Sequence, residues 1–206
     1  MQNTERLILT ERFSSAVEYA RQLHTEYRKG TDVPYLAHLL GVASLVMGEA
    51  GGLVPVTEDM VIAALLHDVV EDHGGMPRLR EVEQRFGANV GRMVAGLSDT
   101  FADDHNKKEG WEQRKLGYLD RLRGESDDVL LISVADKLYN AKSILDEYRV
   151  IGDAVWARFN RGADKQLWYF NALLAVFRKR PSNKIVDDFE RVVRELSKLV
   201  RAGSLG

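Results

Sequence analysis

The sequence contains no cysteine, and this absence excludes several kinds of chemistry. Disulfides, thiolate nucleophiles and cysteine-based zinc sites all require the missing thiol. No apolar run approaches the roughly 20 residues that a helix needs to span a bilayer. The first residues, MQNTERLILTERF, carry too many charges for the apolar core of a signal peptide. We therefore expect a protein of the cytoplasm that does not enter a membrane.

An excess of charge of one sign is also missing. Lysine and arginine total 29 and aspartate and glutamate total 31, which gives a net charge of −2. This balance argues against non-specific binding to nucleic acid or to an acidic membrane surface, although a local basic patch stays open. The hydrophobic fraction of 45% is that of a globular protein. A chain of 206 residues fits one domain, residues 1–206, better than two small ones.

Proline is scarce, and its four positions fall between segments of helical pattern, where it does no damage to a helix. Strand patterns are poor, because the best short run, residues 129–134, continues directly into a helix-forming segment. The spacing of apolar residues predicts an all-α domain of about nine or ten helices. We expect them over residues 10–29, 34–49, 56–73, 77–85, 88–97, 107–123, 126–148, 153–159, 164–178 and 182–201.

The predicted helix over residues 56–73 contains an unusual set of polar residues. In its sequence MVIAALLHDVVEDHGG, residues 60–70 are apolar on nearly every face, yet His67 and Asp68 lie in this run and Glu71 and Asp72 follow it. A buried carboxylate costs several kcal/mol unless it is paired or binds a cation, and acids in the last turn also oppose the helix dipole. A bound metal ion would resolve both conflicts. The alternative is a helix end that frays into solvent.

Two other predicted helices carry polar residues of the same kind. His38 lies inside PYLAHLLGVASLV, and Asp136 follows an apolar run with Asn140 four residues later on the same face. Each alone also fits a buried residue satisfied by hydrogen bonds. Together with His67 and Asp68 they form a set of two imidazoles and two carboxylates. Such a set suits Mn²⁺, Fe²⁺ or Zn²⁺, and helical bundles build metal sites in this way.

The order H…HD…D of these residues resembles that of the HD-domain superfamily of metal-dependent phosphohydrolases. Longer strings are similar to the hydrolase domain of the Rel/SpoT alarmone enzymes and of their small single-domain relatives. This resemblance covers about residues 13–177. The pattern HDxxED is much more specific when it occurs together with the other motifs. The strings are RKGTDVPYLAH, AALLHDVVED, FGANVGRMVAGLSD and VADKLYNAKSI.

The resemblance implies an all-α fold that binds one Mn²⁺ through His38, His67, Asp68 and Asp136. It also implies removal of the 3′-pyrophosphate from guanosine tetra- or pentaphosphate, with GDP or GTP and pyrophosphate as products. By the same analogy Glu71 and Asp72 orient or activate the attacking water, and Asn140 lies beside the metal and the nucleotide. The residues agree with this chemistry, because a divalent ion acidifies bound water and a nearby acid accepts the proton.

A highly charged nucleotide requires cations, and two basic pairs are similar to substrate-contacting pairs of the relatives. Arg28 and Lys29 correspond to a pair that stacks on the base and contacts phosphate. Arg114 and Lys115, in GWEQRKLGYLDRL, correspond to a basic segment near the polyphosphate. For both pairs the alternative is an ordinary solvated helix surface.

Two residues near the C-terminal end of the resemblance share one helix face. Lys165 and Tyr169 are four residues apart, and their position is similar to phosphate- and ribose-contacting residues of the relatives. Aromatic residues on a helix are more often part of the core. The final helix, residues 182–201, has an apolar face that we expect to pack on its own domain.

The chain departs from the family pattern before its RKGT motif. LHTEYRKGT is one residue shorter than the usual HxxQxRK spacing, so His24 receives no role, and the sequence gives no partner for His73. Two alternatives to the alarmone hydrolase remain open. One is a phosphohydrolase for another phosphorylated nucleotide, and the other is a nucleotide-sensing module without catalysis. The presence of Glu71 and Asp72 argues against the sensing module. A homo-oligomer is also left open.

Overall fold

The computed structural model describes residues 6–101, 110–159, 161–180 and 183–203. Within these ranges the chain forms helices and loops, and the only β-type pairing there is an isolated bridge between Tyr27 and Pro34. The predicted all-α class is confirmed. The chain divides into two compact units, Met1–Ala135 and Asp136–Gly206, and each is described by itself.

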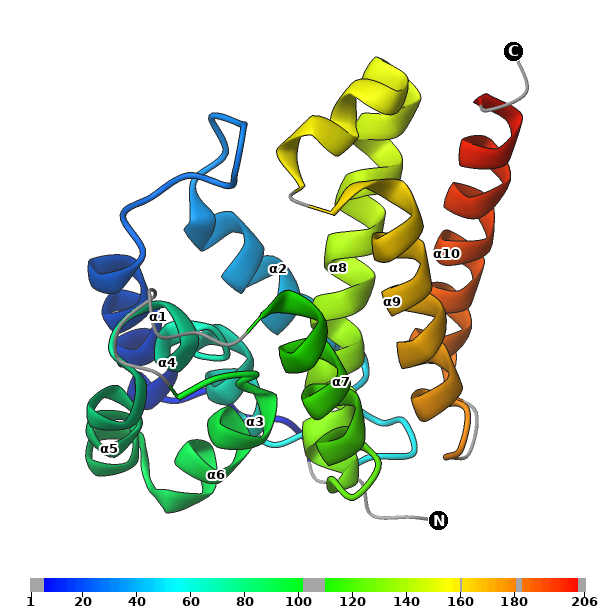
Figure 1. Cartoon of the computed structure of the whole chain (residues 1–206). Helices are drawn as coiled ribbons and strands as arrows, with labels where there is room; N and C mark the ends of the chain where they lie inside the picture. Colours follow the sequence, from blue (N-terminus) through cyan, green and yellow to red (C-terminus); the bar gives the residue numbers. More distant parts are fainter. Residues whose placement is uncertain (1–5, 102–109, 160, 181–182, 204–206) are drawn as a thin grey trace. The chain divides into compact units, whose positions relative to one another are not determined.

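The first unit is built around α3 (Figure 1). This helix packs against α1, α2 and α6, while α5 packs against α4 and α6. Every residue from Met60 to Leu66 is buried, as expected of a central helix with apolar residues on all faces. The helices are α1 (Glu11–Leu23), α2 (Tyr35–Gly48), α3 (Glu58–Leu65), α4 (Val69–Asp72), α5 (Gly75–Phe86), α6 (Ala88–Leu97), α7 (Trp111–Leu122) and the first part of α8 (Asp127–Ile151).

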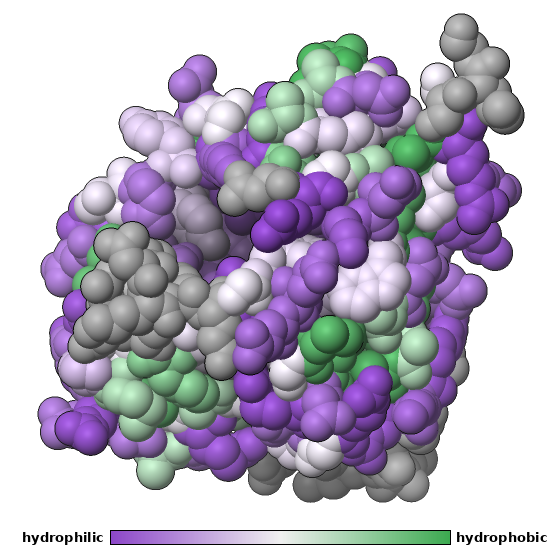
Figure 2. All heavy atoms as spheres, viewed as in Figure 1, coloured by the Kyte–Doolittle hydropathy of each residue, from purple (hydrophilic) through white to green (hydrophobic). Residues whose placement is uncertain are grey.

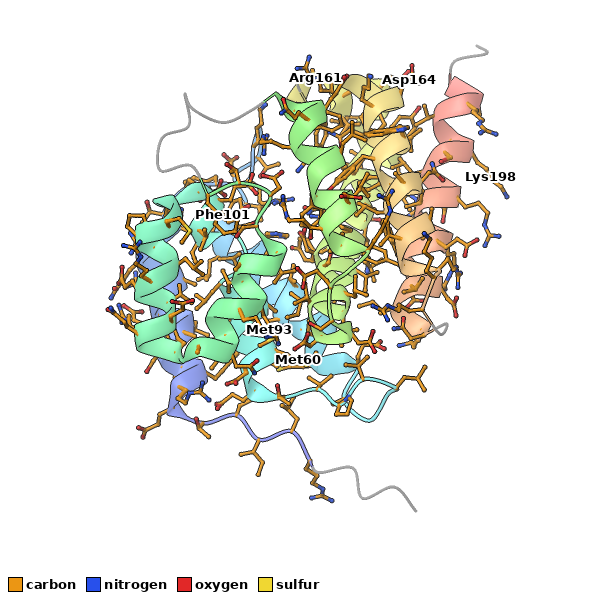
Figure 3. The ribbon with its side chains drawn as sticks, turned by 60° about the horizontal axis from the view of Figure 1, so that its bottom comes forward. Met60, Met93, Phe101, Arg161, Asp164 and Lys198 are labelled. Carbon is orange, nitrogen blue, oxygen red and sulfur yellow. The ribbon has the colours of Figure 1, made fainter. Side chains whose placement is uncertain are left out.

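The start of α3 is capped by a side chain. Thr57 is the N-cap, and its hydroxyl oxygen accepts a hydrogen bond from the Met60 N–H at 3.4 Å. Met60 is buried on α3 and Met93 is buried on the neighbouring α6, and Figure 3 labels both.

Helix α1 ends at Leu23, so the expectation of a helix that continues to residue 29 is wrong. The His24 N–H still donates to the Ala20 carbonyl at 2.9 Å, but the His24 backbone then leaves helical geometry. Residues 24–34 form a loop, drawn in blue between α1 and α2 (Figure 1). Its two ends are joined because the Tyr35 N–H donates to the Glu26 carbonyl at 2.9 Å. Tertiary pairing inside the loop overrides the local helical pattern.

The single helix expected over residues 56–73 is also wrong. The chain forms α3, then a turn over residues 66–68, and then the short α4. Leu66 leaves the helix with φ −107° and ψ 8°. His67 and Asp68 therefore lie on a turn between two helices, and not on a continuous helix surface.

The second unit contains the rest of α8, the 3₁₀ helix η2 (Gly152–Arg158), α9 (Gly162–Phe177) and α10 (Lys184–Gly203). Helices α9 and α10 lie side by side and antiparallel (Figure 1). Between them, the Phe189 ring centre is 5.8 Å from that of Phe170 and 6.1 Å from that of Phe177. The outer face of α10 is hydrophilic (Figure 2), and Lys198 points outward from it (Figure 3). The C-terminal helix therefore packs on its own chain.

Among the described residues, no helix combines the length and the apolar character that a membrane crossing requires.

Candidate metal centre

The turn between α3 and α4 fixes the His67 ring. Its Nδ1 lies 2.7 Å from the Ala64 carbonyl oxygen. A carbonyl oxygen only accepts hydrogen bonds, so Nδ1 carries a ring proton, and in the neutral ring Nε2 has the lone pair that a metal ion would bind. This contact is the kind of outer hydrogen bond that orients metal-binding histidines.

Three side chains converge at this turn, and we name them the buried cluster: His38 of α2, His67 and Asp68. The Nε2 atoms of the two histidines are 3.2 Å apart. Asp68 Oδ2 lies 3.0 Å from His67 Nε2 and 3.5 Å from His38 Nε2. Ligand atoms about 2.0–2.1 Å from one divalent ion are roughly 3–3.4 Å apart, so these three atoms fit a common ion. The cluster could hold a metal ion, and it brings together three of the four predicted ligands. The fourth, Asp136, belongs to the second unit.

Asp68 is stabilised in its charged form. Burial raises the pKa of this carboxyl, but the adjacent His67 and His38 more than offset burial and hold the pKa well below its usual range. The Tyr35 hydroxyl donates a hydrogen bond to Asp68 Oδ2 at 2.6 Å. Burial, together with the charge of Asp68, raises the pKa of Tyr35, so the phenol stays a donor. Sequence reasoning assigned no role to Tyr35, although it directly follows Pro34 at the start of the predicted helix.

A second group of charges, the charged cluster, joins Glu71 of α4 to Asp99, Arg114 and Lys115. Arg114 Nη1 lies 2.6 Å from Asp99 Oδ1 and 3.2 Å from Glu71 Oε1. Lys115 Nζ lies 2.7 Å from Asp99 Oδ2. The Asp99 side chain is only 3% exposed, so these pairs are largely removed from water. Sequence reasoning missed Asp99, although it is the last residue of the motif FGANVGRMVAGLSD.

The pKa values of the two carboxyls in the charged cluster are shifted in opposite directions. Burial raises the pKa of Glu71 to about 7, and the charge of Asp99 adds to this effect against that of Lys115. Burial also raises the pKa of Asp99, but Lys115 and Arg114 outweigh it and hold that pKa far below its usual range. Near neutral pH, Glu71 can therefore accept or release a proton while Asp99 stays charged.

The other residues that the sequence predicts for the first unit lie near these clusters in the chain. Asp72 is the last residue of α4, and its N–H donates to the Asp68 carbonyl at 2.9 Å. The Arg28 guanidinium carbon lies 5.4 Å from the centre of the Tyr35 ring, a cation–π contact. Lys29 is exposed on the same loop.

The remaining predicted residues belong to the second unit. Asp136 is buried on α8, and its Oδ1 accepts a hydrogen bond from Asn140 Nδ2 at 2.6 Å, as their spacing predicts. Its other oxygen pairs with Lys137 Nζ at 2.5 Å, a contact that sequence reasoning missed. On α9, Lys165 is exposed and Tyr169 is buried. The structure places these four predicted residues only within their own unit.

Comparison with known proteins identifies related chains. A family model described as "HD domain" matches residues 16–161, which include all four predicted metal ligands. Human guanosine-3′,5′-bis(diphosphate) 3′-pyrophosphohydrolase MESH1 is 33% identical over 181 residues, which cover 80% of this chain and 92% of the human protein. An enzyme of the same name without the suffix, from Aquifex aeolicus, is 31% identical over 134 residues. The match spans only 18% of the Aquifex protein.

Two solved structures are similar in fold. A metazoan protein described as a SpoT ortholog that hydrolyses ppGpp aligns with a TM-score of 0.69 at 24% identity. The alignment covers 91% of this chain and 97% of that one. The protein lmo0812 of Listeria monocytogenes aligns with a TM-score of 0.61 at 31% identity, over 81% of this chain and 99% of the other.

Proposed function

Because the chain belongs to the HD-domain family, we propose that it is a metal-dependent phosphohydrolase of guanosine 3′,5′-bis(diphosphate). The reaction removes the 3′-pyrophosphate of the tetra- or pentaphosphate and gives GDP or GTP and pyrophosphate. The observation that carries the proposal is the buried cluster, in which two imidazole nitrogens and one carboxylate oxygen converge. The names of the human and Aquifex relatives support the choice of substrate.

The proposed metal ligands are His38, His67, Asp68 and Asp136, and the proposed ion is Mn²⁺. Mixed imidazole and carboxylate ligation suits such an ion, and the fixed tautomer of His67 leaves its Nε2 ready to bind. An ion held there would acidify a bound water and offset the negative charge of the phosphates. Asp136 is included in this set because the sequence motif predicts it as a ligand.

The proton of the attacking water goes to Glu71 in this proposal. Its pKa of about 7 suits a group that must be deprotonated before the reaction and then accept a proton. Arg114 contacts Glu71 Oε1 and limits the positions that the carboxylate can take. Asp72, the next residue, is the second acid proposed to orient the water.

The polyphosphate is proposed to meet cations that are already held in position. Asp99 fixes Arg114 and Lys115 beside Glu71, so no large rearrangement is needed to present their charge. Arg28 and Lys29 are the proposed contacts from the loop over residues 24–34. In the second unit, the proposed nucleotide contacts are Asn140, Lys165 and Tyr169.

The remaining proposals follow from the sequence alone. Residues 1–206 act as one HD-type domain in the cytoplasm, and the partner is a small guanosine polyphosphate and not a nucleic acid. A homo-oligomer is compatible with this proposal.

The decisive experiment measures pyrophosphate release from guanosine 3′,5′-bis(diphosphate) by metal-stripped protein, with and without added Mn²⁺. We expect release of pyrophosphate and GDP only with the metal, and none from the Asp68→Asn variant. Mn²⁺ binding without release would overturn the choice of substrate, and a panel of other phosphorylated nucleotides would then identify the correct one. Tight nucleotide binding without any turnover would instead favour a sensing module.

A further inference from the structure

A second group of potential ligands lies in the first unit, and we name it the loop cluster: His24, Glu26 and His73. His24 directly follows α1, Glu26 lies in the loop over residues 24–34, and His73 directly follows α4. His24 Nδ1 is 2.8 Å from Glu26 Oε1 and 3.1 Å from His73 Nε2. His73 Nε2 is 3.7 Å from Glu26 Oε1. The function proposed above uses none of the three residues.

Hydrogen bonds alone do not account for this convergence. A proton on His24 Nδ1 points toward either Glu26 or His73, so it satisfies only one of the two close contacts. The other nitrogen of His24, Nε2, is buried and has no hydrogen-bond partner. The Glu26 carboxylate holds the proton on Nδ1 in the absence of a metal ion, and an ion that displaced this proton would meet the lone pair of Nδ1. One cation between the three atoms would satisfy all of them together.

The separations fit a small divalent ion. Ligand atoms about 2.0–2.1 Å from a tetrahedral Zn²⁺ are roughly 3.3 Å apart, and the three observed separations lie on both sides of this value. Two imidazoles and one carboxylate favour Zn²⁺ over Mn²⁺ by the usual order of affinities. Three protein ligands leave at least one position for water.

The backbone already holds the three residues in place. The His24 ring stacks on Tyr35, with ring centres 4.8 Å apart and planes inclined by 9°. The Glu26 carbonyl accepts from the Tyr35 N–H, and the His73 carbonyl accepts from Arg78 Nε at 2.9 Å.

We propose that His24, Glu26 and His73 form a second metal site, which takes a borderline divalent transition-metal ion such as Zn²⁺. A bound ion connects the start of the loop that carries Arg28 and Lys29 to the end of α4. The site therefore couples metal binding to the order of that loop. Its existence does not depend on which nucleotide the protein hydrolyses.

The test counts metal ions. Metal-stripped protein is titrated with Zn²⁺ by calorimetry, and with Co²⁺ by the visible absorption of its bound form. We expect two classes of site in the unchanged protein, and the loss of one class in both Glu26→Gln and His73→Gln. Glu26 has a side chain that is 44% exposed, so its variant should fold normally. The matched control is Glu18→Gln, an exposed glutamate of α1 that pairs with Arg21 and Gln22, and it should keep both classes.

The Asp68→Asn variant separates the two sites. We expect it to lose binding at the buried cluster and to keep Zn²⁺ binding that a further His73→Gln change removes. The proposal is wrong if Glu26→Gln and His73→Gln bind as much Zn²⁺ as the unchanged protein. It is equally wrong if Asp68→Asn, shown to be folded by circular dichroism, binds no Zn²⁺ at all.

Discussion

The buried cluster and the loop cluster offer a metal ion the same donors, two imidazole nitrogens and one carboxylate oxygen. Their separations are similar, from 3.0 to 3.5 Å in the first and from 2.8 to 3.7 Å in the second. The clusters differ in what surrounds the ligands. In the buried cluster, the Ala64 carbonyl fixes the His67 tautomer and Tyr35 donates to Asp68. In the loop cluster, His24 Nε2 lacks a hydrogen-bond partner and Glu26 is 44% exposed.

Two sites with the same donor atoms can therefore differ in their affinity for a metal ion. Outer hydrogen bonds typically change metal affinity by about 10–100-fold, so the buried cluster should bind its ion more tightly. Tyr35 connects the two clusters, because its hydroxyl contacts Asp68 while its ring stacks on His24. Changes at matched positions can therefore test each cluster separately.

Removing the carboxylate charge from each cluster should have the largest effect and the most unequal one. Asp68→Asn should abolish Mn²⁺ binding at the buried cluster and reduce pyrophosphate release below detection, because it removes a predicted ligand. Glu26→Gln should reduce release far less. Metal titration and the pyrophosphate assay on both variants measure this difference. Equal losses in the two variants would contradict the separate roles of the clusters.

The acid beside the buried cluster should matter for turnover and not for metal binding. Glu71→Gln removes the proposed proton acceptor, so kcat should fall by roughly 10²–10⁴-fold while Mn²⁺ affinity stays within a few-fold. Steady-state kinetics at saturating Mn²⁺ and a separate metal titration measure the two quantities. A loss of metal binding as large as that of Asp68→Asn would instead make Glu71 a ligand.

The buried cluster can be predicted from the sequence because its polar residues conflict with the apolar segments that contain them. Histidine and aspartate inside apolar helical runs need an explanation, and a shared ion supplies one for His38, His67 and Asp68. The all-α class and the Thr57 cap are similarly encoded in short-range patterns. For these features, spacing along the chain is enough.

The loop cluster and Asp99 depend on contacts between segments that are distant in the sequence. His24 lies 49 residues from His73, and the prediction of a longer α1 placed His24 inside a helix. Asp99 meets Arg114 only because the end of α6 and the start of α7 come together. The break at residues 66–68 likewise lacks the glycine or proline that usually marks the end of a helix. Such features require the tertiary structure.

Tyr35→Phe should weaken the buried cluster and leave the loop cluster intact. The change removes the hydrogen bond to Asp68 but keeps the ring that stacks on His24. Mn²⁺ affinity should fall by about 10–100-fold, as for other outer hydrogen bonds. Zn²⁺ binding by the Tyr35→Phe, Asp68→Asn double variant should equal that of Asp68→Asn alone. A further loss of Zn²⁺ in the double variant would show that the tyrosine hydroxyl supports both clusters.

The smallest expected effect is a shift in pH dependence. Burial raises the pKa of Glu71 to about 7, and the charge of Asp99 contributes to the increase. Glu71 must be deprotonated to accept a proton, so kcat/KM should fall as the pH drops through this pKa. Asp99→Asn removes the negative charge that disfavours the Glu71 carboxylate. It also releases Arg114 and Lys115, whose positive charges can then stabilise that carboxylate. Both changes lower the pKa of Glu71.

The fall in kcat/KM should therefore move to lower pH by roughly one unit in Asp99→Asn, even though the maximal rate decreases. A profile measured from about pH 5 to 9 at saturating Mn²⁺ tests this direction. Asp120→Asn, at an aspartate of α7 whose side chain is 81% exposed, is the matched control and should leave the profile unshifted. A shift to higher pH in Asp99→Asn would contradict this expectation. It would mean that Arg114 moves away from Glu71 in the variant, and that the loss of this cation outweighs the loss of the Asp99 charge.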